Sequence, residues 1–301
     1  MQPFDFDLPT VKALRRQFIL SSHDVCIATY PKCGTTWMQQ LILLLLRGSD
    51  AREFAPMRDA PWLEMSTSSA ANGEKSSSPP IALDDLCHLP PPDRDVDCGR
   101  RVWKTHSPEP HAPWCGGASG AAAAGAKCVI VCRNSKDCAI SLFHHTKNIP
   151  PFAFVGGWED FCPIFLEGRV ESSSFWAWHR GWYRAATTHP GTVLWVSFEE
   201  MKDDLPRVAS KVAAHLGLNR SQAELAAIAE RCGFSTMKAE AARRDAASAA
   251  AGGHVKKGHL REGKVGGWRD TMRSEDVDAF NEKDEELAAQ CGLQMQDHGR
   301  R

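Results

Sequence analysis

The stretch DVCIATYPKCGTTW, residues 24–37, decides the fold of this chain of 301 residues. Its first part, Asp24 to Tyr30, is mostly apolar and predicts a short buried strand. The pattern MQQLILLLLRG after Trp37 predicts a helix that stops near Gly48. A strand, a tight loop and a helix open a βαβ unit, so this stretch favours an α/β fold.

The loop between this strand and this helix has the composition of a phosphate-binding loop. A glycine-containing turn directs several backbone N–H groups to one point, and the helix N-terminus adds the positive end of its dipole. Lys32 adds a full charge, and Thr35 and Thr36 add two hydroxyl donors. An ordinary strand–helix turn is the alternative, but such turns rarely combine these residues with Trp37. We therefore expect a P-loop-like phosphate-binding strand–loop–helix.

Further strand-like segments follow along the chain, at Arg101–Thr105, Cys128–Cys132 and Thr192–Phe198. Helical stretches come after the last two, at Lys136–His145, with Ser135 as its N-cap, and at Leu205–Leu216. Apolar strands that alternate with helices predict a central, mostly parallel β-sheet flanked by helices on both faces. We expect a single α/β domain over residues 1–301, because no long polar linker marks a boundary.

Three low-complexity stretches lie near residues 66–80, 116–126 and 246–253. They are rich in Ser, Ala and Pro, in Gly and Ala, and in Ala with a Gly-Gly end, respectively. The first two lie between strands, and we expect them to be insertions that lengthen surface loops. The third is a candidate lid over a binding site.

The composition excludes several classes of protein. Hydrophobic residues make up 43% and charged residues 24%, as in a globular protein, and the formal net charge is −1. A nearly neutral chain has no global field for nucleic acid, so an anionic ligand needs a local cluster of charge. The longest aliphatic run, Leu41–Leu46, is too short to span a membrane, and the N-terminal residues lack the apolar core of a signal peptide. We expect a cytoplasmic protein that has neither nucleic acid nor membrane as a partner.

Eleven cysteines are scattered along the chain without a C-x-x-C pair. Several lie in strand-like text, such as Cys128 and Cys132 in KCVIVC. In the absence of a secretion signal, this distribution indicates free, buried thiols. We expect neither a disulfide framework nor a metal site.

Two pairs of polar residues near predicted strand ends are suited to chemistry. Lys104 and His106 are two residues apart, so their side chains can emerge on the same face. A histidine with a pKa of about 6.5 can act as a general base, although a lone strand-end histidine is more often structural. Arg133 and Ser141, about two helical turns apart, are suited to bind a second anion. A surface ion pair between Arg133 and Asp137 is the alternative.

Together, these segments resemble the cytosolic sulfotransferase family, which uses 3′-phosphoadenosine 5′-phosphosulfate (PAPS). The resemblance spans residues 30 to 268, and its segments occur in the order of the family. They are YPKCGTTW at Tyr30–Trp37, WKTH at Trp103–His106, RNSKD at Arg133–Asp137, Ser141, FEEM at Phe198–Met201 and REGKVGGW at Arg261–Trp268. A nucleoside-triphosphate P-loop fits less well, because Lys32 precedes Gly34 and the leading glycine is missing.

The resemblance implies the roles of the site residues. The catalytic residues are His106 as the base, Lys32 and Lys104. The residues that bind PAPS are Lys32, Cys33, Gly34, Thr35, Thr36, Trp37, Arg133, Ser141, Phe198, Phe234, Arg261, Glu262 and Gly263. PAPS is the co-substrate, no metal is required, and the partner is a small-molecule acceptor with a hydroxyl or an amine.

The chain departs from the family pattern at several positions. Cys33 replaces Ser, Phe198 replaces Tyr, Glu262 replaces a common Lys and Gly267 replaces Asp. Residues 269–278 echo the family's dimer segment only faintly, which leaves a homodimer as an open possibility. These departures keep two alternatives in view. One is a PAPS-binding protein with weak turnover, and the other is a nucleotide kinase.

Overall fold

The computed structural model describes residues 8–51, 56–66, 97–149, 152–250 and 262–296. A four-stranded sheet with the order β2-β1-β3-β4 forms its centre, and all neighbouring strands are parallel. The strands are β1 (Asp24–Thr29), β2 (Arg101–Thr105), β3 (Lys127–Cys132) and β4 (Val193–Ser197). The predicted strands and the predicted α/β fold with a parallel sheet are therefore confirmed.

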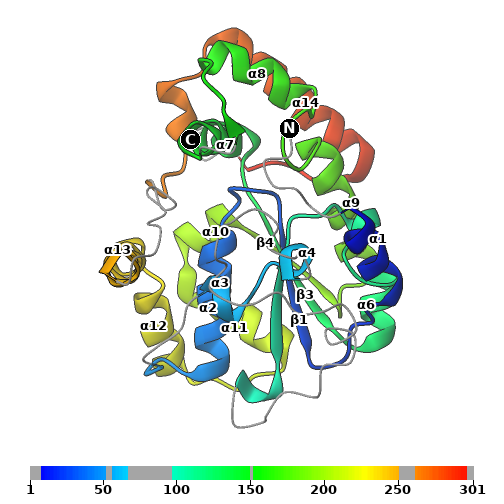
Figure 1. Cartoon of the computed structure of the whole chain (residues 1–301), viewed down its shortest axis with the longest axis vertical. Coiled ribbons are helices and arrows are strands. Elements are labelled where there is room, and N and C mark those ends of the chain that lie inside the picture. The colour runs from blue at the N-terminus through cyan, green and yellow to red at the C-terminus, as the bar shows by residue number, and fades with distance from the viewer. Residues whose placement is uncertain (1–7, 52–55, 67–96, 150–151, 251–261, 297–301) are drawn as a thin grey trace.

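The sheet is covered on both faces because alternate residues of each strand point to opposite sides. On β1, Val25 and Ile27 belong to the apolar cluster that contains α2 (Thr35–Arg47) and α11 (Leu205–Leu216). Cys26 and Ala28 belong to the cluster on the other face, with α6 (Gly117–Ala124) and α9 (Phe175–Thr188). Figure 1 shows α2 and α11 on one side of the sheet and α6 and α9 on the other.

Helix α2 is a core element. Its aliphatic run Leu41–Leu46 is at most 3% exposed, because β1 lies on one side of the helix and α12 (Gln222–Arg231) on another. No helix in the described ranges has the length and apolar character to cross a bilayer. The apolar run is therefore accounted for by burial against the sheet.

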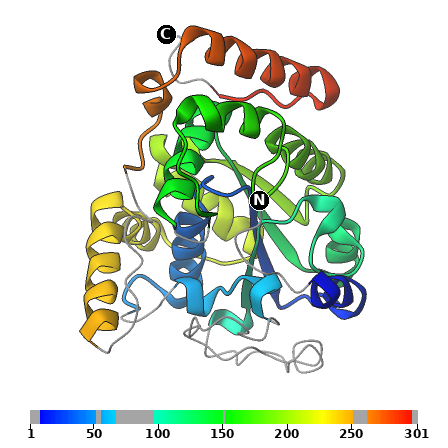
Figure 2. The same cartoon turned by 45° about the horizontal axis from the view of Figure 1, so that its top comes forward.

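A group of helices lies beyond one end of the sheet, where α7 (Ser135–Asn148), α8 (Trp158–Leu166) and α14 (Ser274–Cys291) pack together (Figures 1 and 2). Helix α7 starts three residues after β3 ends, so its N-terminus lies at the carboxyl edge of the sheet. The remaining elements are α1 (Leu8–Gln17), α3 (Pro56–Asp59), α4 (Leu63–Ser66), η1 (Asp97–Gly99), η2 (Glu109–His111), α10 (Phe198–Asp203), α13 (Phe234–Ala250) and η4 (Gly267–Asp270).

Two local predictions, for residues 116–126 and for the N-cap of α7, differ from the structure, and the other low-complexity stretches lie partly outside the described residues. The tract at 116–126 is not an irregular loop: it forms α6, flanked by Gly116 and Gly125, both with positive φ, and buries Ala118 and Ala121. The tract at 246–253 is helical up to the end of α13, and the rest lies outside the described residues, as does the stretch at 66–80 beyond α4. The N-cap of α7 is Asn134, whose side chain accepts from two backbone N–H groups, and not Ser135.

The prediction of buried thiols is confirmed for most of the described cysteines, whereas Cys98 is exposed and Cys115 and Cys291 are half-buried. All those in the described part of the chain are free, and Cys26, Cys128, Cys132 and Cys138 are buried. The side chains of Cys26 and Cys128 stand at the same level of neighbouring strands. The cysteines therefore contribute to packing of the core.

Candidate active site

The phosphate loop follows β1 at the carboxyl edge of the sheet. Its backbone has positive φ at Lys32 (71°) and at Gly34 (107°), and Gly34 is the N-cap of α2. As a glycine, the N-cap residue has no side chain to bond to the first N–H groups of α2. The first N–H groups of a helix have no partner within the helix, so the loop forms a ready site for an anion.

The side chains of the loop are fixed by the surrounding elements. The Oγ1 atoms of Thr29 and Thr35 lie 2.6 Å apart, which ties the end of β1 to the start of α2. Cys33 is fully buried, its Sγ lies 3.6 Å from the Sγ of Cys138, and its N–H donates to the Tyr30 carbonyl. The cysteine that replaces the family's serine thus packs against α7.

His106, which follows β2, lies beside the phosphate loop. Its Nδ1 is 2.8 Å from the carbonyl oxygen of Thr29. A carbonyl oxygen can only accept, so Nδ1 carries the proton and the neutral ring has its lone pair on Nε2. The Nε1 of Trp178 donates to the carbonyl of His106, which holds the backbone of this residue. These two hydrogen bonds therefore fix the orientation of His106 and leave Nε2 of the neutral ring without a proton.

The surroundings of His106 are charged and enclosed. The Nζ of Lys104 lies 4.4 Å from the centre of the Trp62 ring, and the same ring meets His106 edge-on at 4.9 Å. Burial, followed by the charge of Lys104, lowers the pKa of His106 well below its usual value. His106 is therefore neutral near pH 7.

Glu64 supports this segment from α4. Its Oε1 accepts hydrogen bonds from the hydroxyls of Thr105 and Ser107, the two neighbours of His106. Burial raises the pKa of Glu64, against the lowering by these hydrogen bonds. The carboxyl group thus fixes the backbone on both sides of the histidine, a role that the sequence analysis did not assign.

Arg133, which follows β3, does not pair with Asp137. Its guanidinium donates to the carbonyls of Lys32 (3.0 Å) and Lys264 (2.9 Å), and lies 4.3 Å from the centre of the Phe198 ring. Its Nε is buried and has no hydrogen-bond partner in the described ranges. Arg133 therefore joins the phosphate loop to the segment around Lys264 and retains a donor for an anion.

Asp137 holds the C-terminal part of the site. Its carboxylate accepts hydrogen bonds from the backbone N–H groups of Gly266 (2.6 Å) and Trp268 (3.2 Å). Gly263, with a φ of 59°, packs so closely on the Phe234 ring that a Cβ would lie 2.7 Å from a ring carbon. Glu262 is exposed, and Arg261 lies outside the described residues. The segment 263–268 is thus anchored beside Arg133 by α7.

The predicted aromatic residues gather on the other side of the loop. The rings of Trp37 and Phe198 meet edge to face, with centroids 5.3 Å apart, and Trp37 donates to the carbonyl of Cys232. Phe234, two residues further along, is half-buried, so it is not a core residue. These faces can contact a flat base without reading its hydrogen-bonding pattern.

One face of α7 lines the site. Cys138, Ser141 and His145 are three and four residues apart, so they lie on the same side of the helix. Cys138 contacts Cys33, and the Nδ1 of His145 lies 3.4 Å from the Nζ of Lys32. Ser141, between them, is half-buried on this face. Helical spacing from Ser141 could have revealed His145, which the sequence analysis missed.

These contacts bring Lys32, Lys104, His106 and Arg133 to one edge of the sheet, around the turn between β1 and α2. A family model described as a sulfotransferase domain matches residues 22–292 of the chain. The chain belongs to the sulfotransferase family.

Characterised sulfotransferases are similar to this one over most of their length. Sulfotransferase 1A1 of Mus musculus is 28% identical over 267 residues, which cover 86% of this chain and 84% of the mouse protein. The amine sulfotransferase of Oryctolagus cuniculus is 28% identical over 286 residues, which cover 92% of this chain and 85% of the rabbit protein.

Solved structures agree with the fold of this sulfotransferase. Retinol dehydratase in a complex with retinol and PAP, the desulfated form of PAPS, matches with a TM-score of 0.74 and 19% identity, over 96% of this chain and 88% of that chain. A mouse sulfotransferase complexed with PAP matches with a TM-score of 0.68 and 23% identity, over 94% and 90%. At these identities the similarity shows the architecture.

Proposed function

We propose that this sulfotransferase moves the sulfuryl group of PAPS to a hydroxyl or an amine of a small molecule, with His106 as the general base. The observation that carries the proposal is the hydrogen bond from Nδ1 of His106 to the Thr29 carbonyl, which leaves Nε2 as the basic atom beside the phosphate loop. The structures of PAP complexes that match the fold support the choice of donor.

In the proposed step, the acceptor oxygen or nitrogen attacks the sulfur of PAPS in line with the leaving group. The new bond to sulfur forms as the bond between sulfur and the 5′-phosphate oxygen breaks, and the acceptor's proton passes to Nε2 of His106. PAP leaves with the electron pair of the broken bond. The charge that builds on the 5′-phosphate is stabilised by Lys32, Lys104 and the N–H groups at the start of α2.

The 3′-phosphate of PAPS is assigned to a second group of residues, around Arg133 and Ser141. Arg133 has an Nε without a partner in the described structure, and Ser141 lies on the α7 face beside the loop. Arg261 and the backbone near Gly263 complete this pocket by their resemblance to the family. Trp37, Phe198 and Phe234 are assigned to adenine, for which they supply aromatic faces.

The low pKa of His106 fits this role. Burial and two lysines keep the free ring neutral, so its lone pair is available near pH 7. Bound PAPS brings several negative charges next to the same lysines, which raises the basicity of the ring again when the acceptor is in place. His106 is therefore neutral before the reaction, and bound PAPS increases its basicity.

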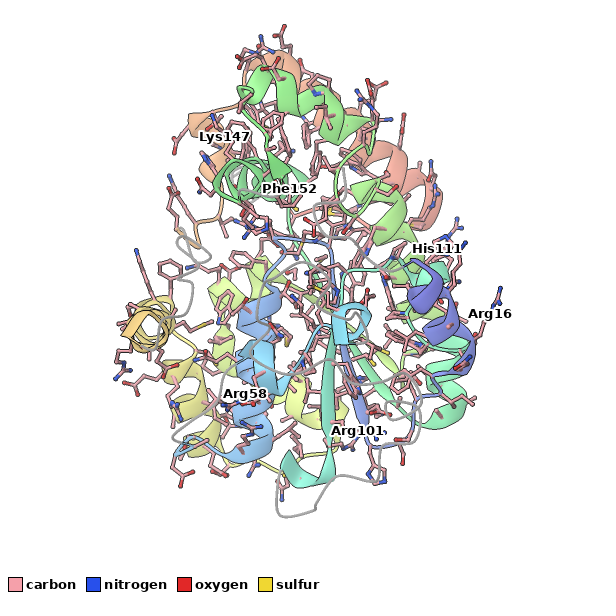
Figure 3. The ribbon with its side chains drawn as sticks, in the orientation of Figure 1. Arg16, Arg58, Arg101, His111, Lys147 and Phe152 are labelled. Atoms are coloured by element: carbon pink, nitrogen blue, oxygen red, sulfur yellow. The ribbon has the colours of Figure 1, made fainter. Side chains whose placement is uncertain are left out.

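The test compares His106→Ala with His111→Ala, a control on an exposed histidine next to α1 (Figure 3). We expect His106→Ala to lower turnover by roughly two orders of magnitude or more, as for loss of a general base, while PAP binds nearly as tightly. Labelled PAPS with a panel of phenols, steroids, flavonoids and amines measures turnover, and calorimetry measures binding. Equal losses of binding and turnover would contradict the assigned role.

The same assay separates the alternatives. Tight binding of PAP without transfer to any acceptor would identify a PAPS-binding protein with weak turnover. Turnover of ATP that stops in excess EDTA would identify a kinase, since phosphoryl transfer from ATP needs a metal ion. Sulfuryl transfer that persists in EDTA supports the proposed function.

A further inference from the structure

The carboxyl group of Glu171 lies in the turn between α8 and α9, which is tied to the end of β1 through Tyr30. The turn is closed by a hydrogen bond from the N–H of Ser173 to the carbonyl of Val170. Tyr30, the residue before the phosphate loop, is fully buried, and its hydroxyl donates to the carbonyl of Ser173 (2.8 Å). This bond fixes the turn to the loop. Glu171 is therefore held near the loop by a rigid connection.

The carboxyl group of Glu171 has an unused acceptor. Its Oε2 is buried and has no hydrogen-bond partner in the described part of the chain. Burial raises the pKa of Glu171, and the positive charges of Lys104 and Lys32 oppose that rise, so both lysines lie within electrostatic reach. A buried oxygen without a donor is costly, and a ligand with a suitable donor removes that cost.

The other titratable groups that the structure describes near Glu171 do not donate a hydrogen bond to its Oε2. His106 and His145 are neutral, with the pKa of His145 lowered to about 3 by burial and by Lys32. In the complex with PAPS that we propose, Lys32 and Lys104 face the 5′-phosphosulfate. The negative charge of PAPS then disfavours a bare carboxylate at Glu171 still further, so the ionised form of Glu171 needs a cation beside it.

Aromatic side chains contact the lysine and the histidines of this region. Trp62 contacts both Lys104 and His106, and the buried ring of Phe152 lies 6.0 Å from the ring of His145. Figure 3 shows Phe152 beside α7, whereas Lys147 points away on the outer side of this helix. A flat acceptor ring can lie against these aromatic side chains while a polar substituent reaches Glu171.

We propose that Glu171 determines acceptor specificity by binding a protonated amine that the acceptor carries in addition to its reacting hydroxyl. The proposal rests on the proposed function, since it concerns the acceptor of that reaction. It assigns this sulfotransferase to aromatic hydroxyl compounds with a cationic side chain. The ammonium group provides both the hydrogen-bond donor and the charge that the carboxylate lacks.

The test uses two acceptors of similar size, tyramine, which carries an ammonium group, and 4-propylphenol, which does not. We expect the wild type to favour tyramine in kcat/KM by about tenfold or more, as for one charge-assisted hydrogen bond. Glu171→Gln should abolish that preference by raising the KM for tyramine, with 4-propylphenol little changed. The control, Glu167→Gln, alters an exposed carboxylate four residues away that pairs with Arg169.

Further measurements test whether the charge of Glu171 causes the preference. Glu171→Asp keeps the charge and should retain part of the preference, and thermal unfolding with PAP checks that each variant is folded. Lowering the pH through the raised pKa of Glu171 should reduce the preference for tyramine, because a protonated carboxyl group cannot pair with a cation.

The outcomes separate this inference from the proposed function. Equal use of both phenols by the wild type, or a preference that survives Glu171→Gln, overturns the role of Glu171 and leaves sulfuryl transfer standing. A preference for neutral acceptors with a second hydroxyl also overturns it, since the partner is then not a cation. No transfer to any acceptor despite PAP binding contradicts the proposed function itself.

Discussion

The backbone of the phosphate loop turns at Gly34, in a conformation that a side chain rarely adopts. A Cβ on Gly34 would meet a carbon of the Phe198 ring at 3.0 Å, and the φ of 107° adds strain of about 1–2 kcal/mol. Phe198 also stacks under Arg133, so a displaced Phe198 ring disturbs both the phosphate loop and Arg133. The glycine thus sets the distance between the loop and the aromatic pair.

We predict that Gly34→Ala weakens binding of PAP by roughly tenfold or more and lowers the melting temperature. The matched control is Gly191→Ala, because a Cβ at Gly191 has nothing within 4 Å. Calorimetry with PAP and thermal unfolding measure the two effects. A Gly34→Ala variant that binds PAP like the wild type would show that the loop adjusts without cost.

Single residues were predictable where chemistry and spacing act locally. Lys32, Gly34 and His106 stand at strand ends, so the sequence alone places them at one edge of a parallel sheet. The partners of Arg133 were not predictable, because its guanidinium bonds to carbonyls of segments far away in the chain. Glu171 lies in a turn whose position depends on the bond from Tyr30, which no local pattern reports.

At the scale of elements, strands were predicted to within about a residue of their ends because each is a short apolar run between polar residues. The error at α6 has a physical cause. Gly116 and Gly125 flank the tract and suggest a loop, but glycines with positive φ also end helices, and the alanines between them favour a helix. Burial of Ala118 and Ala121 then stabilises α6 against the sheet.

Helix α7 holds the segment that we assign to the nucleotide through its first turn. Asp137 accepts two backbone hydrogen bonds from the segment 266–268, and Arg133 holds the adjacent Lys264 carbonyl. We predict that Asp137→Ala weakens PAP binding by about tenfold, because two bonds to a carboxylate are lost, while kcat at saturating PAPS stays near wild type. Asp137→Asn keeps an acceptor oxygen, so its affinity for PAP should lie between those of the wild type and Asp137→Ala.

The measurement is a PAP titration together with kcat and KM for PAPS. Asp278→Ala, at an exposed position on α14, is the control. If Asp137→Ala lowers kcat and leaves PAP affinity unchanged, then Asp137 acts on the chemical step and does not hold the nucleotide segment.

At the scale of the whole molecule, α14 joins the helices beyond the sheet. Asp284 on α14 accepts from Ser135 of α7 and from Trp176 of α9, and Asn281 accepts from the buried Lys136. Burial raises the pKa of Asp284, whereas it lowers the pKa of buried histidines. Stability in acid is therefore the sum of opposing contributions from the two kinds of group.

His179 makes the clearest of these contributions. It is fully buried, its Nδ1 donates to the carbonyl of Phe175 (2.8 Å), and burial lowers its pKa to about 3. The unfolded chain binds a proton at this residue near pH 6.5, whereas the folded protein does not, so folding excludes that proton. The stability that this group supplies is complete above pH 6.5 and is lost as the pH falls toward 3.

We predict that His179→Phe removes this part of the pH dependence. Its aromatic ring keeps the packing against Phe175 and Tyr30, and it cannot take up a proton in the unfolded state. Urea unfolding between pH 7.5 and 4.5 should show the wild type losing stability relative to His179→Phe as the pH falls. Carboxyl groups with raised pKa values act equally on both proteins, so the difference isolates the histidine. Parallel curves for the two proteins would mean that His179 is protonated in the folded state, with a partner for Nε2 that opens in acid.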